Sequence, residues 1–207
     1  LSRLPTAGLA SGIDFALNGP AEALRRLDLA GACRIGFTAM TELAYEPSGY
    51  NSVRGRTHNP WNLDFVTGGS SSGSAVATAS GTVVAALGSD TGGSLRIPAH
   101  CCGVTAWKPT FGIVSMSGAL PLAPTLDVIG LLTRSANDML PVFDVLAGDQ
   151  LPSVRAPINS AVVLNDVLAA AEPSVRCACG QGIDAMELCG VKLDRVKALS
   201  AIEAIDV

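Results

Sequence analysis

The sequence predicts an α/β fold, because short apolar runs of strand length alternate with helix-length segments along most of the chain. Two clusters of glycine and serine, residues 68–74 and 88–94, each lead into one of the predicted helices. The chain has 207 residues, of which 48% are hydrophobic and 15% charged. This composition is typical of a globular protein with a substantial core.

The first predicted element is a helix over 20–29, with Pro20 in its first turn, Asn18 as a possible cap and Gly31 at its end. Leu24 and Leu27 lie on one face of this helix at helical spacing. A strand over 33–38 and a brief helix over 39–45 are expected next. Residues 46–64 are rich in Pro, Gly, Asn, Ser and Arg and predict a long ordered loop, a type of segment that is often functional.

The patterns of the remaining chain predict six further helices or strands before residue 165 and a helical end after it. Pro98 fits the first turn of the second of these helices. The expected elements are helices over 74–80, 95–102 and 137–147, strands over 83–87, 104–107 and 161–164, a linker over 150–157, and helical segments over 166–175 and 184–204.

Composition argues against several classes of function. The net charge of −4 provides no basic surface for direct nucleic-acid binding. No apolar run approaches the roughly 18 residues of a membrane helix, and the start lacks the layout of a signal peptide, so a cytoplasmic location is the default expectation. Cys101 and Cys102 are adjacent, and Cys177 and Cys179 nearly so, which favours free thiols over disulfides. Cys177, Cys179 and Cys189 have no fourth ligand nearby, so no metal site is expected.

Ser94 follows Thr91-Gly92-Gly93 at the start of a predicted helix. Backbone N–H groups there have no intrahelical partner, and they could hold the oxyanion formed when a serine attacks a carbonyl. The two glycines would allow the turn and leave room for a substrate. The alternative is purely structural, with Ser94 as a helix cap beside a tight turn.

The cluster around Ser70, Ser71 and Ser72 is too polar for a core and is expected to face the same cavity as Ser94. It has neither the Walker ending nor the spacing of a dinucleotide fingerprint. Residues 69–73 also match the G-x-S-x-G nucleophile elbow of an α/β-hydrolase esterase, with Ser71 as nucleophile. That chemistry needs a later acidic residue and then a histidine, and the only downstream histidine is His100.

The run GGSSSGSAVATASGTVVAALGSDTGGSLRIPAHCCGVTAWKPTFG, residues 68–112, resembles the signature region of the amidase signature hydrolases. This family includes the A subunit of the glutamyl-tRNA amidotransferase. The resemblance extends to residues 36–44 (GFTAMTELA), 59–61 (NPW) and 127–138. It implies a partial amidase domain over 1–207, with a mixed β-sheet flanked by helices, a signature core over 67–112 and a less similar tail over 150–207.

The resemblance implies that Ser94 is the nucleophile of a carboxamide hydrolase and that Ser70, after a cis peptide bond with Gly69, relays its proton. Oxyanion donors would be the backbone N–H groups of Thr91, Gly92, Gly93 and Ser94. Ser71, Asp90 and Arg96 would support the network. Ser72 stands where the family more often has glycine, which would strain Ser72 if that position needs a positive φ.

The family's general base is a neutral lysine that precedes the segment resembled by Thr6-Ala7-Gly8, but the first lysine here is Lys108, which matches a structural position. We therefore expect a chain that starts after its catalytic lysine, stops short of the family's C-terminal half and is nearly inactive alone. No cofactor is implied, and the substrate would be a small-molecule amide. The alternative is a non-catalytic remnant or an assembly partner resembling the A subunit of the amidotransferase; homo-oligomers and amidotransferase-type partner subunits are both compatible with the sequence.

Overall fold

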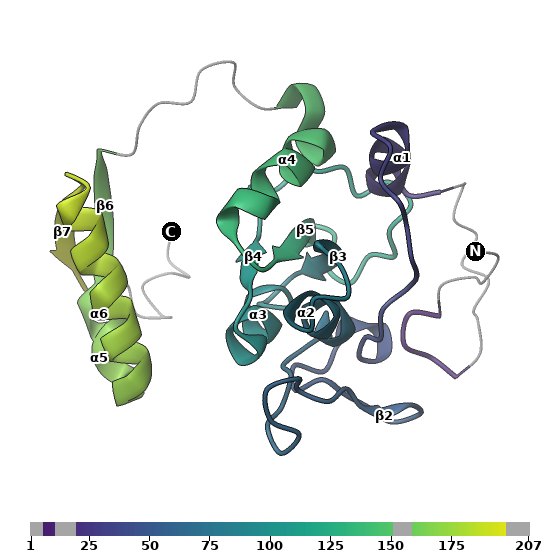
Figure 1. Cartoon of the computed structure of the whole chain (residues 1–207), viewed down its shortest axis with the longest axis horizontal. Coiled ribbons are helices and arrows are strands. Elements are labelled where there is room, and N and C mark those ends of the chain that lie inside the picture. The colour runs from purple at the N-terminus through teal and green to yellow at the C-terminus, as the bar shows by residue number, and fades with distance from the viewer. Residues whose placement is uncertain (1–5, 11–19, 151–158, 198–207) are drawn as a thin grey trace. The chain divides into compact units, whose positions relative to one another are not determined.

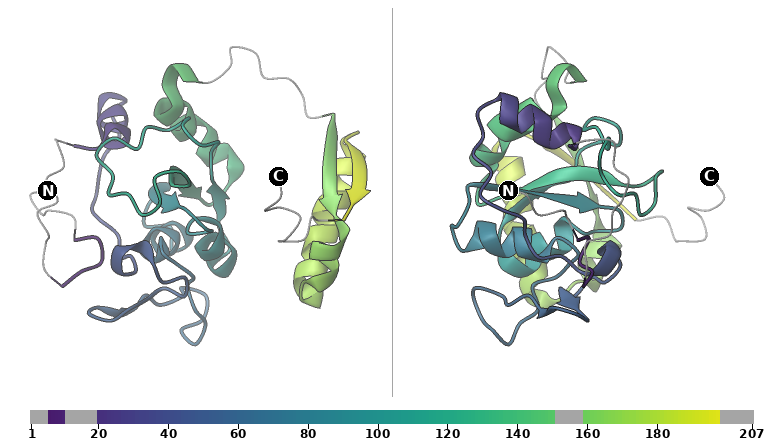
Figure 2. Two further views of the ribbon diagram at one scale, coloured as in Figure 1. Left: turned by 180° about the vertical axis from the view of Figure 1, so that it is seen from behind. Right: turned by 90° about the vertical axis from the view of Figure 1, so that its right-hand side faces the viewer.

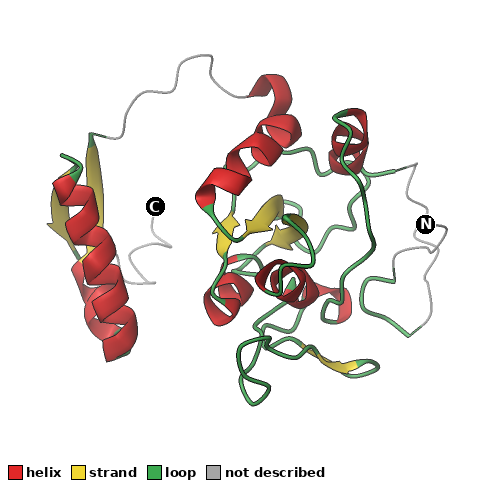
Figure 3. Ribbon diagram, in the orientation of Figure 1, coloured by secondary structure: helices red, strands yellow, loops and turns green. Residues whose placement is uncertain are grey.

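The computed structural model describes residues 6–10, 20–150 and 159–197, which belong to two compact units, Leu1–Leu151 and Pro152–Val207. Figure 1 labels the elements, and Figure 3 separates helices, strands and loops. The first unit contains α1 (Glu22–Leu29), the 3-10 helix η1 (Glu42–Ala44), β1 (Tyr50–Asn51), β2 (Gly55–Arg56), α2 (Ser72–Ala79), β3 (Ala85–Asp90), α3 (Arg96–Cys102), β4 (Thr105–Trp107), β5 (Val128–Thr133), α4 (Ala136–Ala147) and the 3-10 helix η2 (Gly148–Gln150).

A three-stranded antiparallel sheet in the order β3-β5-β4 organises the first unit. Its central strand β5 is buried at every position and was not among the expected elements. Because helices cover both faces of the sheet, this strand is a continuous apolar run and lacks the polar and apolar alternation of a half-exposed strand. The α/β class is confirmed, with the sheet of this unit antiparallel throughout.

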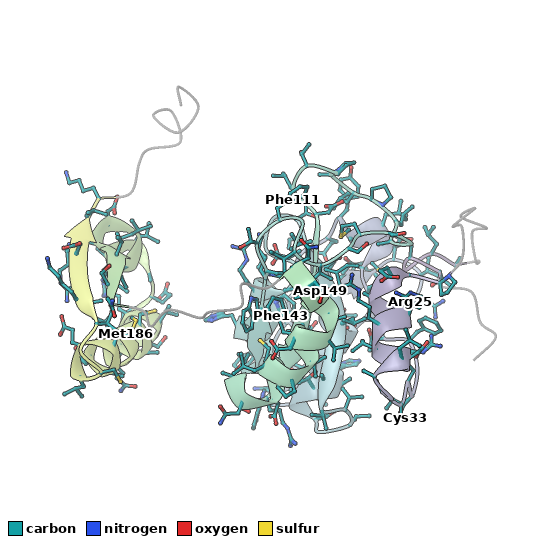
Figure 4. The ribbon with its side chains drawn as sticks, turned by 90° about the horizontal axis from the view of Figure 1, so that it is seen from above. Arg25, Cys33, Phe111, Phe143, Asp149 and Met186 are labelled. Atoms are coloured by element: carbon teal, nitrogen blue, oxygen red, sulfur yellow. The ribbon has the colours of Figure 1, made fainter. Side chains whose placement is uncertain are left out.

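Two hydrophobic clusters pack on opposite faces of this sheet, with α1 and α4 on one side and α2 and α3 on the other (Figure 1, Figure 2). Successive residues of β5 point to opposite faces, so Leu131 packs with the α1 and α4 cluster and Leu132 with the α2 and α3 cluster. Phe143 of α4, labelled in Figure 4, stacks on Trp107 of β4 with ring centroids 4.2 Å apart. Both glycine/serine clusters are thus attached to helices on one face of the sheet.

The first predicted helix is confirmed as α1, and Gly31 follows its end with a φ of 83°. Asn18 lies outside the described residues. The strand expected over 33–38 is wrong, because these residues are exposed and pair with no described strand. Their continuation instead bonds to the start of α2, where the Gly73 N–H donates to the Ala39 carbonyl at 2.9 Å. The helix expected over 39–45 shortens to η1.

The middle of the chain follows the sequence-based expectations closely. The helices expected over 74–80, 95–102 and 137–147 are α2, α3 and α4, and the strands expected over 83–87 and 104–107 are β3 and β4. β3 starts later than expected and continues to Asp90, so residues 88–90 of the second glycine/serine cluster lie on the strand and residues 91–94 form the turn after it. The long loop over 46–64 is confirmed and contains the small β1-β2 hairpin.

The second unit contains β6 (Ser160–Leu164), α5 (Asn165–Ala170), α6 (Pro173–Leu188) and β7 (Lys192–Val196), with β6 and β7 parallel. Apolar side chains gather between β6 and α6, among them Val163, Ile183 and the labelled Met186 (Figure 4). The helix expected over 184–204 is right for residues 184–188, which belong to α6, and wrong for residues 192–196, which form β7 after Gly190 ends the helix with a φ of 82°. The linker residues 151–158 and the last residues, 198–207, lie outside the described part.

None of the helices in the described ranges has both the length and the hydropathy that crossing a bilayer requires.

A substitution at Gly130 in β5 would test how tightly the sheet is packed. A Cβ at this position would collide with the Trp107 carbonyl oxygen and would meet Leu95 Cδ1 at 2.5 Å. We expect Gly130→Ala to lower the free energy of unfolding by about 1–3 kcal/mol, measured by urea denaturation. Gly36→Ala is the control, because a Cβ there meets nothing within 4 Å. Equal stability of the two variants would contradict this packing.

Candidate active site

Asp90, the last residue of β3, is 0% exposed and organises the turn that follows it. Its carboxylate accepts hydrogen bonds from the backbone N–H groups of Gly93 at 2.9 Å and Leu95 at 3.0 Å. The Arg96 guanidinium binds both carboxylate oxygens, with Nε at 3.1 Å and Nη2 at 2.9 Å. One buried carboxylate thereby fixes the backbone from residue 93 to the start of α3.

The charge of Asp90 is stabilised by these bonds. Burial alone would raise the pKa of its carboxyl group, but the hydrogen bonds from Arg96 and from the Leu95 N–H, together with the positive charge of Arg96, leave the pKa below its ordinary value. The same hydrogen bond raises the pKa of Arg96. The pair therefore stays ionised at neutral pH.

Three backbone donors of this turn are not used within the described residues, since the N–H groups of Thr91, Gly92 and Ser94 meet no acceptor there. Gly93 differs from the expectation of a free donor, because its N–H already donates to Asp90. Gly92 is exposed, and a Cβ on it would meet nothing within 4 Å. The turn thus presents unpaired N–H groups beside open space, which suits a substrate oxygen that becomes negatively charged.

The first serine cluster meets this turn directly. The Ser71 N–H donates to the Ser94 carbonyl at 3.2 Å, which brings the two segments into contact. Ser70, whose peptide bond with Gly69 is cis as expected, is 1% exposed, and its hydroxyl has no hydrogen-bond partner in the part of the chain that the structure describes. A buried hydroxyl without a partner is unusual in proteins and is a position where a further polar group would be accommodated.

Ser71 does not have the geometry that the nucleophile-elbow alternative requires. Its hydroxyl accepts from the Ser89 N–H and donates to the Ser89 carbonyl, both at 3.3 Å, so it braces the strand end. His100 is exposed on α3. Ser72 begins α2 and is not among the non-glycine residues with positive φ, so the strain considered for it is absent.

Several other residues singled out in the sequence have structural surroundings. Lys108 Nζ contacts the carbonyl of its neighbour Pro109 at 3.5 Å. Cys102 is fully buried in the α2 and α3 cluster, and burial raises the pKa of its thiol to about 11. All six cysteines are free.

The sequence analysis gave no role to Asp127, the first residue of the 127–138 stretch that resembles the family, and the structure places it beside the turn. The Thr91 hydroxyl donates to one oxygen of its carboxylate. A signal was present in the sequence, because an acidic residue directly precedes the apolar run 128–132. Only the register of β3 against β5, which pairs Asp90 with Val128, brings this residue to the site.

Known proteins resemble this chain in sequence and in fold. The chain matches the protein family described as Amidase over residues 5–204. It is 49% identical over 143 residues to the A subunit of glutamyl-tRNA(Gln) amidotransferase from Pseudothermotoga lettingae, covering 69% of this chain and 29% of that protein. The corresponding protein of Deinococcus radiodurans is 40% identical over 191 residues, covering 85% of this chain and 40% of that protein.

Solved structures show the same likeness. The crystal structure of an amidase superposes with a TM-score of 0.83 at 38% identity, covering 94% of this chain and 45% of that one. The A subunit of glutamyl-tRNA(Gln) amidotransferase from Thermotoga maritima gives a TM-score of 0.83 at 31% identity, covering 95% and 47%. The chain therefore spans less than half the length of each of these four proteins.

Replacing Asp90 by asparagine tests the role of its charge. The Asp90→Asn change removes the negative charge and one of the two carboxylate oxygens that accept hydrogen bonds from the turn. We therefore expect the free energy of unfolding to fall by about 2–4 kcal/mol at pH 7. A lowered folded-state pKa means that this stabilisation is complete above the unfolded value of about 3.9 and is lost as the pH falls through the folded value. The difference between wild type and variant, measured by urea unfolding, should therefore shrink below about pH 4.

The control for this experiment is Asp64→Asn, which changes an exposed aspartate of the 46–64 loop. It should leave stability within about 0.5 kcal/mol of wild type. A loss of stability in Asp90→Asn that persists unchanged at pH 3 would contradict the charge-based explanation.

Proposed function

Because the chain belongs to the amidase family, we propose that the protein hydrolyses the C–N bond of a small-molecule carboxamide with Ser94 as nucleophile. The observation that carries this proposal is the contact between the two serine clusters. The buried Ser70 hydroxyl, without a partner among the described residues, lies one residue from the Ser71 N–H that donates to the Ser94 carbonyl. Residues 1–207 are proposed to be part of one amidase domain, with the signature core over 67–112.

In the proposed reaction the Ser94 hydroxyl oxygen bonds to the substrate carbonyl carbon while its proton passes to Ser70. Ser70 in turn gives a proton to a neutral lysine supplied from outside these 207 residues, since no lysine precedes Lys108. The protonated lysine returns the proton through Ser70 to the leaving nitrogen, and the C–N bond breaks. Water then hydrolyses the acyl ester on Ser94 and releases the carboxylic acid.

The oxyanion of the tetrahedral intermediate is assigned to the unpaired N–H groups of Thr91, Gly92 and Ser94. The turn needs a glycine at position 93, because the φ of 136° there is one that residues with a side chain rarely adopt. Its N–H, engaged by Asp90, supports the turn from within. The oxyanion site is therefore built from backbone, and Asp90 prevents it from rearranging.

Asp90, Arg96 and Ser71 are proposed as supports of this machinery. Asp90 and Arg96 hold the far end of the turn through their paired hydrogen bonds. Ser71 connects the Ser70 segment to the end of β3 through its bonds with Ser89. Their contribution lies in fixing the distance between the two reactive hydroxyls and the backbone donors.

A second candidate function follows from the names of the relatives. Two of them, at 49% and 40% identity, are the A subunit of a glutamyl-tRNA(Gln) amidotransferase. The protein could accordingly act on its amide within an amidotransferase assembly, together with other subunits, in the cytoplasm. A non-catalytic amidase-like protein with a purely assembling role is the third candidate, and an α/β-hydrolase esterase is disfavoured by the engaged Ser71 hydroxyl.

Ser94→Ala tests the proposed function in the full-length protein. We expect its turnover of a primary carboxamide to fall by about 10⁴-fold or more, because no other group replaces the nucleophile. Ammonia release measures turnover, and circular dichroism should show an unchanged fold. A serine-reactive fluorophosphonate should label wild type and not the variant.

Ser80→Ala is the matched control, since Ser80 caps the other end of α2 and is exposed. Its turnover and labelling should equal wild type. Retained hydrolysis in Ser94→Ala would reject the assignment of the nucleophile. Full-length wild type without hydrolysis or labelling, alone and with partner subunits, would instead favour the assembling role.

A further inference from the structure

The Asp127 carboxylate is buried at 4% exposure and forms hydrogen bonds in two directions. One oxygen accepts from the Thr91 hydroxyl, and the other accepts from the backbone N–H groups of Leu122 at 2.8 Å and Ala123 at 2.9 Å. Within the described residues no lysine, arginine or histidine forms an ion pair with it. Burying a charge is costly unless it is hydrogen-bonded, so these three donors stabilise the buried carboxylate.

This carboxylate contacts the part of the turn that Asp90 leaves free. Asp90 binds the N–H groups of Gly93, Leu95 and Arg96, all in the second half of the turn. In the first half, the N–H groups of Thr91 and Gly92 meet no acceptor among the described residues, and a Cβ on Gly92 would meet nothing within 4 Å. The Thr91 side chain is therefore the one anchored group between Asp90 and Gly93 in the described structure.

Asp127 is itself held in place by the strand that follows it and by a local turn. Asp127 immediately precedes β5, and its neighbour Val128 pairs with Asp90 across the sheet. The Asp127 N–H donates to the Ala123 carbonyl at 2.9 Å, so the carboxylate sits on a closed turn at residues 123–127. Thr91 is in this way connected to the central strand.

We propose, on the basis of the function proposed above, that Asp127 is a positioning residue of the reaction. Acting through the Thr91 hydroxyl, it fixes the orientation of the peptide group between Thr91 and Gly92, whose N–H is one of the oxyanion donors. Two buried carboxylates then fix the turn, because Asp90 binds its end and Asp127 binds its beginning. A group that orients an oxyanion donor acts on the transition state and not on the bound substrate.

The test is a double-mutant cycle with Asp127→Ala, Thr91→Val and the double variant, assayed in the full-length protein with a primary carboxamide. Each single change should lower kcat about 10- to 100-fold with KM within about 3-fold of wild type, because the donor is misplaced but still present. If Asp127 acts through Thr91, the double variant should be no slower than the slower single variant within about 3-fold. Asp127→Asn, which can still bond to Thr91, should have an intermediate kcat.

The control is Asp138→Ala, which removes another aspartate carboxylate of the downstream segment, bonded to Ser135 at the start of α4. This variant should keep the wild-type kcat after correction for the folded fraction. Wild-type kcat in Asp127→Ala, a multiplicative loss in the double variant or an equal loss in Asp138→Ala would overturn the proposal while leaving the proposed function intact. A wild-type enzyme without amide hydrolysis would overturn the proposed function and this inference with it.

Discussion

The buried carboxylate of Asp90 is the constraint on which the site depends. It satisfies the N–H groups of Gly93, Leu95 and Arg96 and binds the Arg96 guanidinium, all within one turn of chain. Because these groups are satisfied by Asp90, the turn is held in a conformation in which the N–H groups of Thr91, Gly92 and Ser94 have no partners among the described residues. A helix cap alone would not produce this arrangement, since Leu95 at the start of α3 makes no side-chain cap.

The sheet transmits this constraint to the first serine cluster. β5 packs against both hydrophobic clusters, and its Leu132 lies in the one formed with α2 and α3. The helix that follows Ser71 and the helix that follows Ser94 are therefore fixed to the same strand. Contact between their preceding turns, through the Ser71 N–H and the Ser94 carbonyl, is a result of core packing as much as of local hydrogen bonding.

Local sequence signals predicted α1, α3 and α4, which are amphipathic or end at a glycine. They failed for elements whose structure depends on contacts with residues far away in the sequence. β5 lacks the alternation of an exposed strand because both its faces are covered. The sequence predicted a helix where β7 lies, but Gly190 ends the preceding helix and the residues after it pair with β6. In the site, the family resemblance pointed to Ser70, Ser94 and Asp90. The Gly93 N–H is engaged locally, by the Asp90 side chain three residues earlier. The placement of Asp127 depends on the register of β3 against β5, which no local pattern encodes.

The pairing of Asp90 with Val128 has a consequence for how this architecture could diversify. The chain from Thr91 to Asp127 forms α3 and the edge strand β4 and then returns to the position opposite Asp90, so the pairing of β3 with β5 closes this segment whatever its length. Chain-closure entropy rises only slowly with added residues, by about 0.6 kcal/mol for each doubling. Insertions around Phe111, which is exposed on the connection between β4 and β5, could therefore lengthen that connection while the strand ends stay in place.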